Sequence, residues 1–173
     1  MIFVSGIHGV GKTYFCDMLR AKLGIETYSA SQLIEKRKSV LFSPKKHVSD
    51  IEQNQVLLLE AIEELRGSGY EFVLDGHFCL LNERGDITRI SKETYISLKP
   101  DAMILLTEEP SVIADRRYQR DGIKQELSEI FRFQEAERAY AIEIATELGI
   151  PLEISSGAAD IDRIVDFVKA GGY

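Results

Sequence analysis

Residues 6–13, GIHGVGKT, have the types and spacing of a phosphate-binding loop. They fit the pattern G-x-x-x-x-G-K-S/T. Gly6, Gly9 and Gly11 let the backbone curl so that its N–H groups point at phosphate oxygens. A helix that begins at Lys12 directs the positive end of its dipole at the same anion. An ordinary Gly-rich turn between a strand and a helix is the alternative.

The loop residues divide by chemical role. Lys12 can reach β- and γ-phosphates as a point charge, and the Thr13 hydroxyl can ligate Mg²⁺. His8 is expected to act through its backbone N–H, as a spacer, rather than through its ring. The residues expected to bind the nucleotide are Gly6, His8, Gly9, Val10, Gly11, Lys12, Thr13 and Tyr14.

A second candidate site follows the apolar run 72–74, where Asp75 precedes Gly76 and His77. In an open α/β sheet, ligands bind beyond the carboxyl ends of the strands. Asp75 is therefore expected to hold a Mg²⁺-bound water or to accept a proton from an attacking hydroxyl. A turn-forming Asp-Gly pair is the alternative. His77 could contact a substrate phosphate or cap the loop, and both interpretations stay open.

Arg116 and Arg120 lie four residues apart, on one face of an expected helix. Guanidinium groups at the mouth of a site can stabilise the charge of a phosphoryl group in transfer. Asp121 and Gly122 then permit a hinge, so residues 116–127 are expected to form a short lid. A solvated charged helix is the alternative. Arg132 and Arg138, on the next helix, are second-rank candidates.

Hydrophobic periodicity predicts the elements that must position these residues. The expected strands are 2–5, 25–28, 72–74, 102–106 and 152–155, and the expected helices are 12–23, 31–38, 50–66, 91–98, 110–120, 127–148 and 161–170. Strands that alternate with helical crossovers predict an α/β fold with a five-stranded parallel sheet flanked by helices. Residues 78–90 are expected to form a β-hairpin insertion, and 39–49 a loop whose cluster Lys45-Lys46-His47 faces solvent.

Length and composition limit the remaining classes. The chain of 173 residues fits one domain, over 1–173, with its own core. With 21 Lys and Arg against 28 Asp and Glu, the net charge is −7, which disfavours general nucleic-acid binding. Two cysteines favour a reducing, cytoplasmic location over a disulfide scaffold. A membrane helix and a signal peptide are not expected.

Across nearly its whole length the sequence resembles the nucleoside monophosphate kinase group of P-loop proteins. It is most similar to the small adenylate-kinase-like branch with a reduced lid. The segments that carry the resemblance are 6–13, 28–34, 74–77, 99–106, 148–151 and 155–158, together with Pro110 and the pair Arg116 and Arg120.

The resemblance implies a P-loop NTPase fold and phosphoryl transfer from MgATP to a small acceptor, with a nucleoside monophosphate expected. Lys12, Asp75, Arg116 and Arg120 would be the catalytic residues, and Thr13 and Asp75 the Mg²⁺ ligands. Gly157 and Ala158 would border the adenine. Residues 29–66 would form the acceptor region.

The sequence departs from the family on the acceptor side. Glu35 stands where members often have an arginine that grips the acceptor phosphate, with Lys36 and Arg37 just after it. No arginine follows Asp75 and Gly76, and the form Asp-x-His, with His77, is closer to that of the archaeal-type branch. The acceptor is therefore expected to contact Ser31, Arg37, His77 and Arg84, with Arg89 as a further hairpin candidate.

Two other functions remain open. One is an ATP-hydrolysing switch, which would need a water-positioning residue and an unknown protein partner. The other is a kinase of a non-nucleotide metabolite, which Glu35 favours. Turnover that an added acceptor stimulates would separate a kinase from a switch, and the identity of that acceptor would separate the two kinases.

Overall fold

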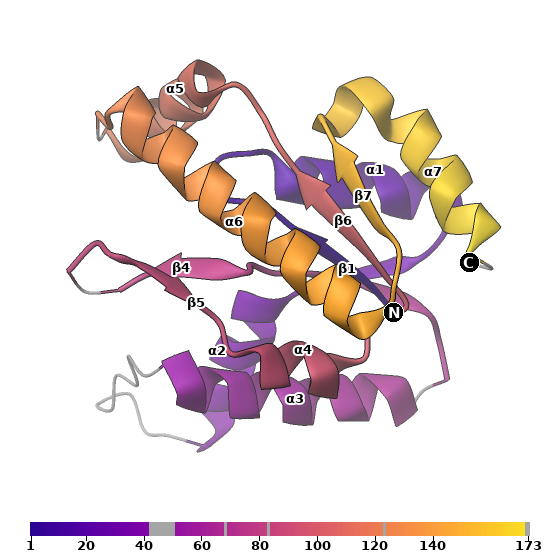
Figure 1. Cartoon of the computed structure of the whole chain (residues 1–173). Coiled ribbons are helices and arrows are strands. Elements are labelled where there is room, and N and C mark those ends of the chain that lie inside the picture. The colour runs from indigo at the N-terminus through magenta and orange to yellow at the C-terminus, as the bar shows by residue number, and fades with distance from the viewer. Residues whose placement is uncertain (42–50, 68, 83, 123, 172–173) are drawn as a thin grey trace.

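A five-stranded parallel sheet forms the centre of the molecule. In the computed structural model, which describes residues 1–41, 51–67, 69–82, 84–122 and 124–171, its strand order is β2-β3-β1-β6-β7 (Figure 1). The strands are β1 (Ile2–Ser5), β2 (Glu26–Ser29), β3 (Phe72–Asp75), β6 (Ala102–Leu106) and β7 (Leu152–Ser155). The expected α/β class is confirmed.

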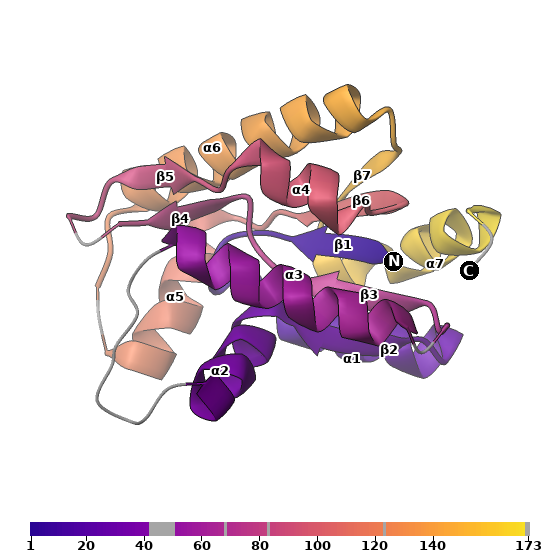
Figure 2. The same ribbon diagram turned by 90° about the horizontal axis from the view of Figure 1, so that it is seen from below.

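The middle strands are apolar because helices cover both faces of the sheet. Every residue of β1 and of β6 is buried. Helices α1 (Lys12–Leu23) and α7 (Ile161–Ala170) cover one face, while α4 (Lys92–Leu98) and α6 (Leu127–Leu148) cover the other (Figures 1 and 2). The remaining helices are α2 (Ala30–Leu41), α3 (Ile51–Gly67) and α5 (Pro110–Asp121).

Strand pairing corrects some of the expected boundaries. Glu26–Ser29 pairs residue for residue with Phe72–Asp75, so β2 begins one residue later than expected and β3 ends one residue later. Helix α2 begins directly after β2 and extends to Leu41. A short 3-10 helix, η1 (Gly157–Asp160), was not expected. The cluster Lys45-Lys46-His47 lies outside the described residues.

The expected hairpin is present as a two-stranded antiparallel sheet, β4 (Cys79–Leu81) with β5 (Ile87–Arg89). Asn82 organises its turn, because its Oδ1 accepts the N–H groups of Arg84 and Asp86 at 2.9 Å. The hairpin lies beside α6 in both ribbon views (Figures 1 and 2). This places the segment after β3 between the sheet and α6.

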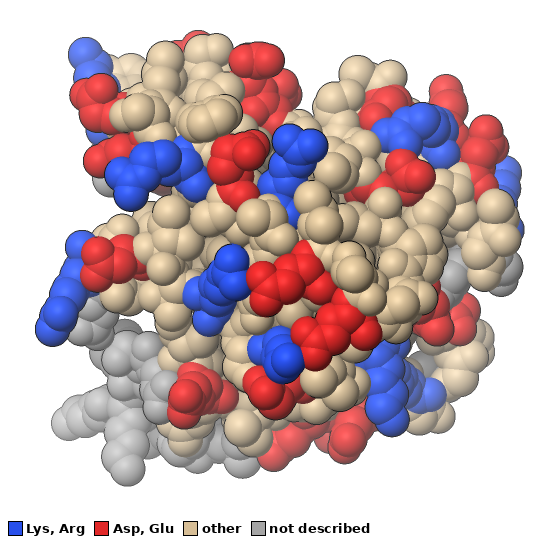
Figure 3. All heavy atoms as spheres, viewed as in Figure 1, with Lys and Arg blue, Asp and Glu red and all other residues tan. Residues whose placement is uncertain are grey.

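Charges are mixed on the surface. Figure 3 shows Lys and Arg interspersed with Asp and Glu across one face rather than gathered in a basic patch. That distribution agrees with the net charge of −7. Within the described residues, none of the helices has the length and apolarity needed to span a membrane.

Candidate active site

A cleft of about 890 Å³ opens at the carboxyl ends of β1, β2 and β3. The phosphate-loop segment, the start of α1, the β2–α2 corner, α3 and the lid helix α5 all contribute to its walls. The residues that line it include His8, Gly9, Gly11, Lys12, Thr13, Tyr14, Ser31, Glu35, Asn54, Gln55, Asp75, His77, Arg116, Arg117 and Arg120. The cleft therefore joins most of the residues that the sequence singles out.

The loop backbone favours glycine at three positions, since Gly11 also has a positive φ, of +106°. Gly6 and Gly9 have φ of +146° and +83°, which L side chains rarely adopt. A Cβ on Gly6 would lie 2.8 Å from the Leu106 carbonyl oxygen, and one on Gly9 would lie 3.0 Å from Cγ of Arg117. The neighbouring strand and the lid helix thus close around the loop and fix its curvature.

Lys12 is buried at the inner end of the cleft. Its Nζ donates to the Gly6 carbonyl at 2.6 Å and lies 3.8 Å from Oδ1 of Asp75. The same ammonium lies 3.5 Å from Nε2 of His77. Burial lowers the pKa of Lys12, and the Asp75 carboxylate opposes that shift. The sequence places these residues far apart, and the fold brings them together around one charge.

Asp75 and Thr13 fit the task of holding Mg²⁺. Burial raises the pKa of Asp75, while the Lys12 ammonium lowers it. Oδ1 of Asp75 is buried and has no hydrogen-bond partner among the residues that the structure describes. A buried carboxylate oxygen of this kind is completed by a cation or by its water shell. The Thr13 hydroxyl faces the same cleft from the first turn of α1.

The rings of His8 and His77 lie against each other in the cleft near Lys12, with centroids 4.4 Å apart and planes tilted by 46°. Burial in the cleft, followed by the charges of Lys12 and Arg117, lowers the pKa of His8 to about 4. Burial and Lys12 also hold the pKa of His77 well below its ordinary value. Both rings are therefore neutral at pH 7, so each offers one N–H donor rather than a positive charge.

Of the two α5 arginines predicted from the sequence, Arg116 contacts the loop. Nη1 of Arg116 donates to the carbonyls of Gly9 at 3.3 Å and Val10 at 3.0 Å, and Nη2 pairs with Glu108 at 3.0 Å. Arg120 lines the cleft and binds the Asp121 carboxylate through two N–H groups, at 2.8 and 2.6 Å. The expected pair thus reaches the cleft, with Arg116 on the loop backbone and Arg120 at its mouth.

Arg117 is a residue that sequence reasoning missed. It is 8% exposed, and its Nε donates to the His8 carbonyl at 2.8 Å. Nη1 donates to Gln125 at 2.5 Å, while Nη2 is buried without a partner in the described part of the chain. Its position four residues after the buried Ile113 places it on the apolar stripe of α5, which was the available signal.

The wall of the cleft that α2 and α3 form carries polar side chains. The hydroxyls of Ser29 and Ser31 lie 2.9 Å apart. Glu35 lines the cleft from α2, and Asn54 and Gln55 line it from α3. Oδ1 of Asn54 is buried and has no hydrogen-bond partner within the described residues. This wall therefore contains one buried amide oxygen whose hydrogen-bonding capacity is unused within the described residues.

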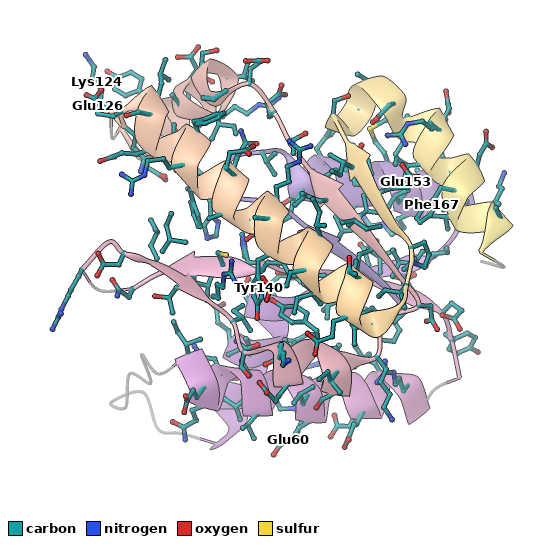
Figure 4. The ribbon with its side chains drawn as sticks, viewed as in Figure 1. Glu60, Lys124, Glu126, Tyr140, Glu153 and Phe167 are labelled. Atoms are coloured by element: carbon teal, nitrogen blue, oxygen red, sulfur yellow. The ribbon has the colours of Figure 1, made fainter. Side chains whose placement is uncertain are left out.

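Several sequence-predicted residues lie outside the described lining of the cleft. Nη2 of Arg37 donates to Oε2 of Glu64 at 2.5 Å, and Nη1 lies 3.9 Å from Oε2 of Glu60. The Glu60 side chain points away from the sheet (Figure 4). Arg84 lies in the exposed hairpin turn. Gly157 and Ala158 lie in η1, which packs against α1. The structure therefore does not bring these four residues to the cleft.

A phosphate-binding loop, a facing carboxylate and lid arginines, placed at the end of a parallel sheet, define a P-loop kinase. The chain belongs to the AAA domain family AAA_17, whose family model matches residues 5–132. Together these findings make the protein a phosphotransferase of the P-loop class.

Relatives with assigned names differ in their acceptors. A Methanocaldococcus jannaschii protein named "Putative adenylate kinase" is 26% identical over 178 residues, covering 95% of this chain and 81% of that protein. A gluconokinase structure from Sinorhizobium meliloti 1021 has a TM-score of 0.53 at 17% identity and covers 99% of this chain and 97% of its own. A shikimate kinase structure from Bacteroides thetaiotaomicron has a TM-score of 0.56 at 15% identity, with coverages of 98% and 96%. At these identities the two structures show the fold alone.

Proposed function

We propose that the protein transfers the γ-phosphoryl group of MgATP to a nucleoside monophosphate. The observation that supports this most is the single cleft that runs from the loop to the polar wall of α2 and α3. A kinase needs both substrates in one continuous space, with the acceptor oxygen in line with the γ-phosphorus. The Methanocaldococcus jannaschii relative named "Putative adenylate kinase" supports the same choice.

Within this proposal, the loop residues hold the triphosphate and Lys12 neutralises charge on the β- and γ-phosphates. A bound Mg²⁺ would supply positive charge that offsets the negative charge of the phosphate groups. Thr13 and Asp75 would hold that ion. Arg116 and Arg120 would stabilise the phosphoryl group in transfer and limit the access of water, as parts of a lid over 116–127. The whole chain would act as one kinase domain.

The acceptor would lie in the region 29–66. Asn54 and Gln55 offer amide groups, which can both accept and donate hydrogen bonds to the edge of a base. The neutral ring of His77 and the hydroxyl of Ser31 line the same cleft and would contact the acceptor phosphate.

Cys16 and Cys79 form no disulfide in the described structure, which supports action in the reducing cytoplasm.

One observation favours a second acceptor class. Arg37 is engaged by Glu60 and Glu64, while the Glu35 carboxylate faces the cleft. A carboxylate repels an incoming phosphate but binds hydroxyl groups well. A hydroxylated metabolite without a phosphate is therefore the second candidate acceptor.

The deciding experiment measures ADP release from MgATP against a panel of nucleoside monophosphates, nucleosides and hydroxylated metabolites. Strong stimulation by one nucleoside monophosphate is expected. Stimulation by a phosphate-free acceptor alone would replace the proposal with the second candidate. Slow release that no acceptor stimulates would instead favour an ATP-driven switch. The variant Lys12→Ala, measured in parallel, gives the background rate.

A further inference from the structure

A buried carboxylate on α6 holds the segment that follows β3. Glu137 is 1% exposed. Its Oε1 accepts the N–H of Phe78 at 2.9 Å, and its Oε2 accepts the N–H of Cys79 at 2.6 Å. Burying an ionisable group is costly unless hydrogen bonds compensate it. Both carboxylate oxygens are used here on consecutive peptide units, directly beyond His77.

Two other elements hold the same segment. The N–H of Gly76 donates to the Val4 carbonyl of β1 at 2.9 Å, and the Phe3 ring would lie 2.7 Å from a Cβ at this position. The Tyr95 hydroxyl of α4 donates to the His77 carbonyl at 2.8 Å. Residues 76–79 are thus fixed by groups from β1, α4 and α6, which are far apart in the sequence.

The fixed backbone carries two side chains that face the Lys12 ammonium. Asp75 precedes the held residues, and His77 lies among them, at 3.8 and 3.5 Å from Nζ of Lys12. Glu137 therefore acts on the reacting end of the cleft through the backbone that it holds, without lining the cleft itself.

We propose that Glu137 and Tyr95 are positioning residues for phosphoryl transfer, which hold residues 75–79 so that Asp75 and His77 face Lys12. This inference rests on the proposed kinase function but not on the identity of the acceptor. A purely structural role would lower stability and leave the turnover of the folded protein unchanged. A positioning role lowers kcat in protein that is still folded.

The chain offers a matched control for each residue. Glu143 lies on the same helix as Glu137 but pairs with Arg89 at the surface, at 2.9 Å. The Thr146 hydroxyl donates to the Ile142 carbonyl at 2.7 Å, on the exposed part of α6. The variants Glu137→Gln and Tyr95→Phe therefore test the proposal. Glu143→Gln and Thr146→Val remove a carboxylate contact and a hydroxyl contact that do not involve residues 76–79.

The primary readout is ADP release from MgATP, with and without acceptor, at a temperature where thermal melts show all variants folded. We expect kcat to fall about tenfold in Glu137→Gln and Tyr95→Phe, with the KM for ATP within about twofold of the wild type. In both controls kcat should stay within about twofold of the wild type. An unchanged kcat in Glu137→Gln and Tyr95→Phe, with only a lower Tm, would overturn the proposal. If Glu137→Gln does not fold, Tyr95→Phe decides.

A second readout does not depend on activity. The rings of His8 and His77 lie close enough for a ring-proton nuclear Overhauser effect, with centroids 4.4 Å apart. We expect this signal to weaken in Glu137→Gln and Tyr95→Phe and to persist in the controls. Persistence in all four variants would refute positioning. A wild-type protein that shows the signal but releases no ADP would refute the kinase proposal instead.

Discussion

At the scale of single residues, Lys12 combines two properties that normally conflict, since it is both buried and expected to carry charge. Desolvation disfavours the charged form of Lys12. The hydrogen bond to the Gly6 carbonyl and the nearby Asp75 carboxylate favour it. An ammonium held at the base of the loop needs no large rearrangement when phosphate arrives. Its contribution to turnover should therefore exceed its contribution to stability.

The variant Lys12→Ala tests this directly. We expect turnover to fall by about 10²–10³-fold or more, because one preorganised charge facing the transferred group is lost. Circular dichroism should show an intact fold. Lys22→Ala is the matched control, since Lys22 lies on the same helix and pairs with Asp162 at the surface. Full activity of Lys12→Ala would refute the assignment of the loop.

The variant Gly9→Ala separates backbone strain from ligand binding. A left-handed alanine costs about 1–2 kcal/mol, and its Cβ would press on Arg117. Gly24→Ala introduces the same left-handed strain at the end of α1, where the described structure places no heavy atom within 4 Å of the new Cβ. Both variants should melt earlier. Only Gly9→Ala should bind MgATP more weakly, as measured by calorimetry, and equal binding by both would contradict a glycine requirement at the loop.

The positions of site residues could be predicted from the sequence where the role of a residue depends on a local pattern. Lys12, Thr13 and Asp75 follow strands at fixed offsets, so their places in the cleft could be anticipated. Arg37 could not be placed, because its partners Glu60 and Glu64 come from a helix whose packing is tertiary. Glu137 had a usable signal, since it continues the buried stripe of Ile130, Phe133, Tyr140 and Ile144 on α6.

At the scale of elements, α5, which we propose as part of a lid, is already docked on the phosphate loop. Arg116 and Arg117 donate to three carbonyls of the phosphate loop, those of His8, Gly9 and Val10. Carbonyls held from outside orient the loop amides toward the interior of the cleft. Arg120, one turn further along, is bound only to Asp121 in the described structure and can exchange that partner for phosphate.

The variant Arg120→Ala should lower kcat more than it weakens the binding of ATP, because its charge is needed most in the transition state. Steady-state kinetics together with a direct ATP-binding measurement would separate the two effects. Arg138→Ala, on α6 and outside the described lining of the cleft, is the control. An unchanged kcat in Arg120→Ala would argue against a role for this arginine in the lid.

The contact between α6 and the hairpin predicts a dependence of stability on pH. Burial raises the pKa of Glu137 from 4.5 to about 7, although the Phe78 and Cys79 amides oppose the shift. The folded state therefore binds a proton more tightly than the unfolded state. The resulting stability is fully present below pH 4.5 and is lost as the pH rises to about 7, by a few kcal/mol. Chemical denaturation at several pH values should show this slope in the wild type but not in Glu137→Gln. Parallel curves would refute the assignment.

Helices and strands were predicted with boundary errors of a few residues because their apolar periods are local. The helices at 12–23 and 127–148 also have a glycine directly after their last residue, where the chain turns left-handed. The docking of the lid and the attachment of the hairpin to α6 depend on side chains that meet only in the folded chain. Hydrophobic periodicity alone therefore could not predict the geometry of these two contacts.

At the scale of the whole molecule, the strand order explains why one cleft gathers the site. β1 lies in the middle of the sheet, with β3 on one side and β6 on the other. The chain leaves β1 through the phosphate loop and builds first one half of the sheet and then the other. Loops diverge at such a point and leave a crevice. The sequence predicted five parallel strands, but their order follows from pairings that no local pattern encodes.

The two cysteines lie in different parts of the molecule, so their reactivity can report on the opening of each part separately. Cys16 lies in α1 beside the cleft and Cys79 lies in β4 against α6, and burial raises the pKa of each thiol to about 12. Alkylating reagents need an exposed thiolate, so each cysteine reacts only when its own surroundings open. Alkylation followed by mass spectrometry would thus time two local openings separately. MgATP should slow the modification of Cys16 much more than that of Cys79. Equal protection of the two thiols would mean that the surroundings of α1 and of β4 open as one unit.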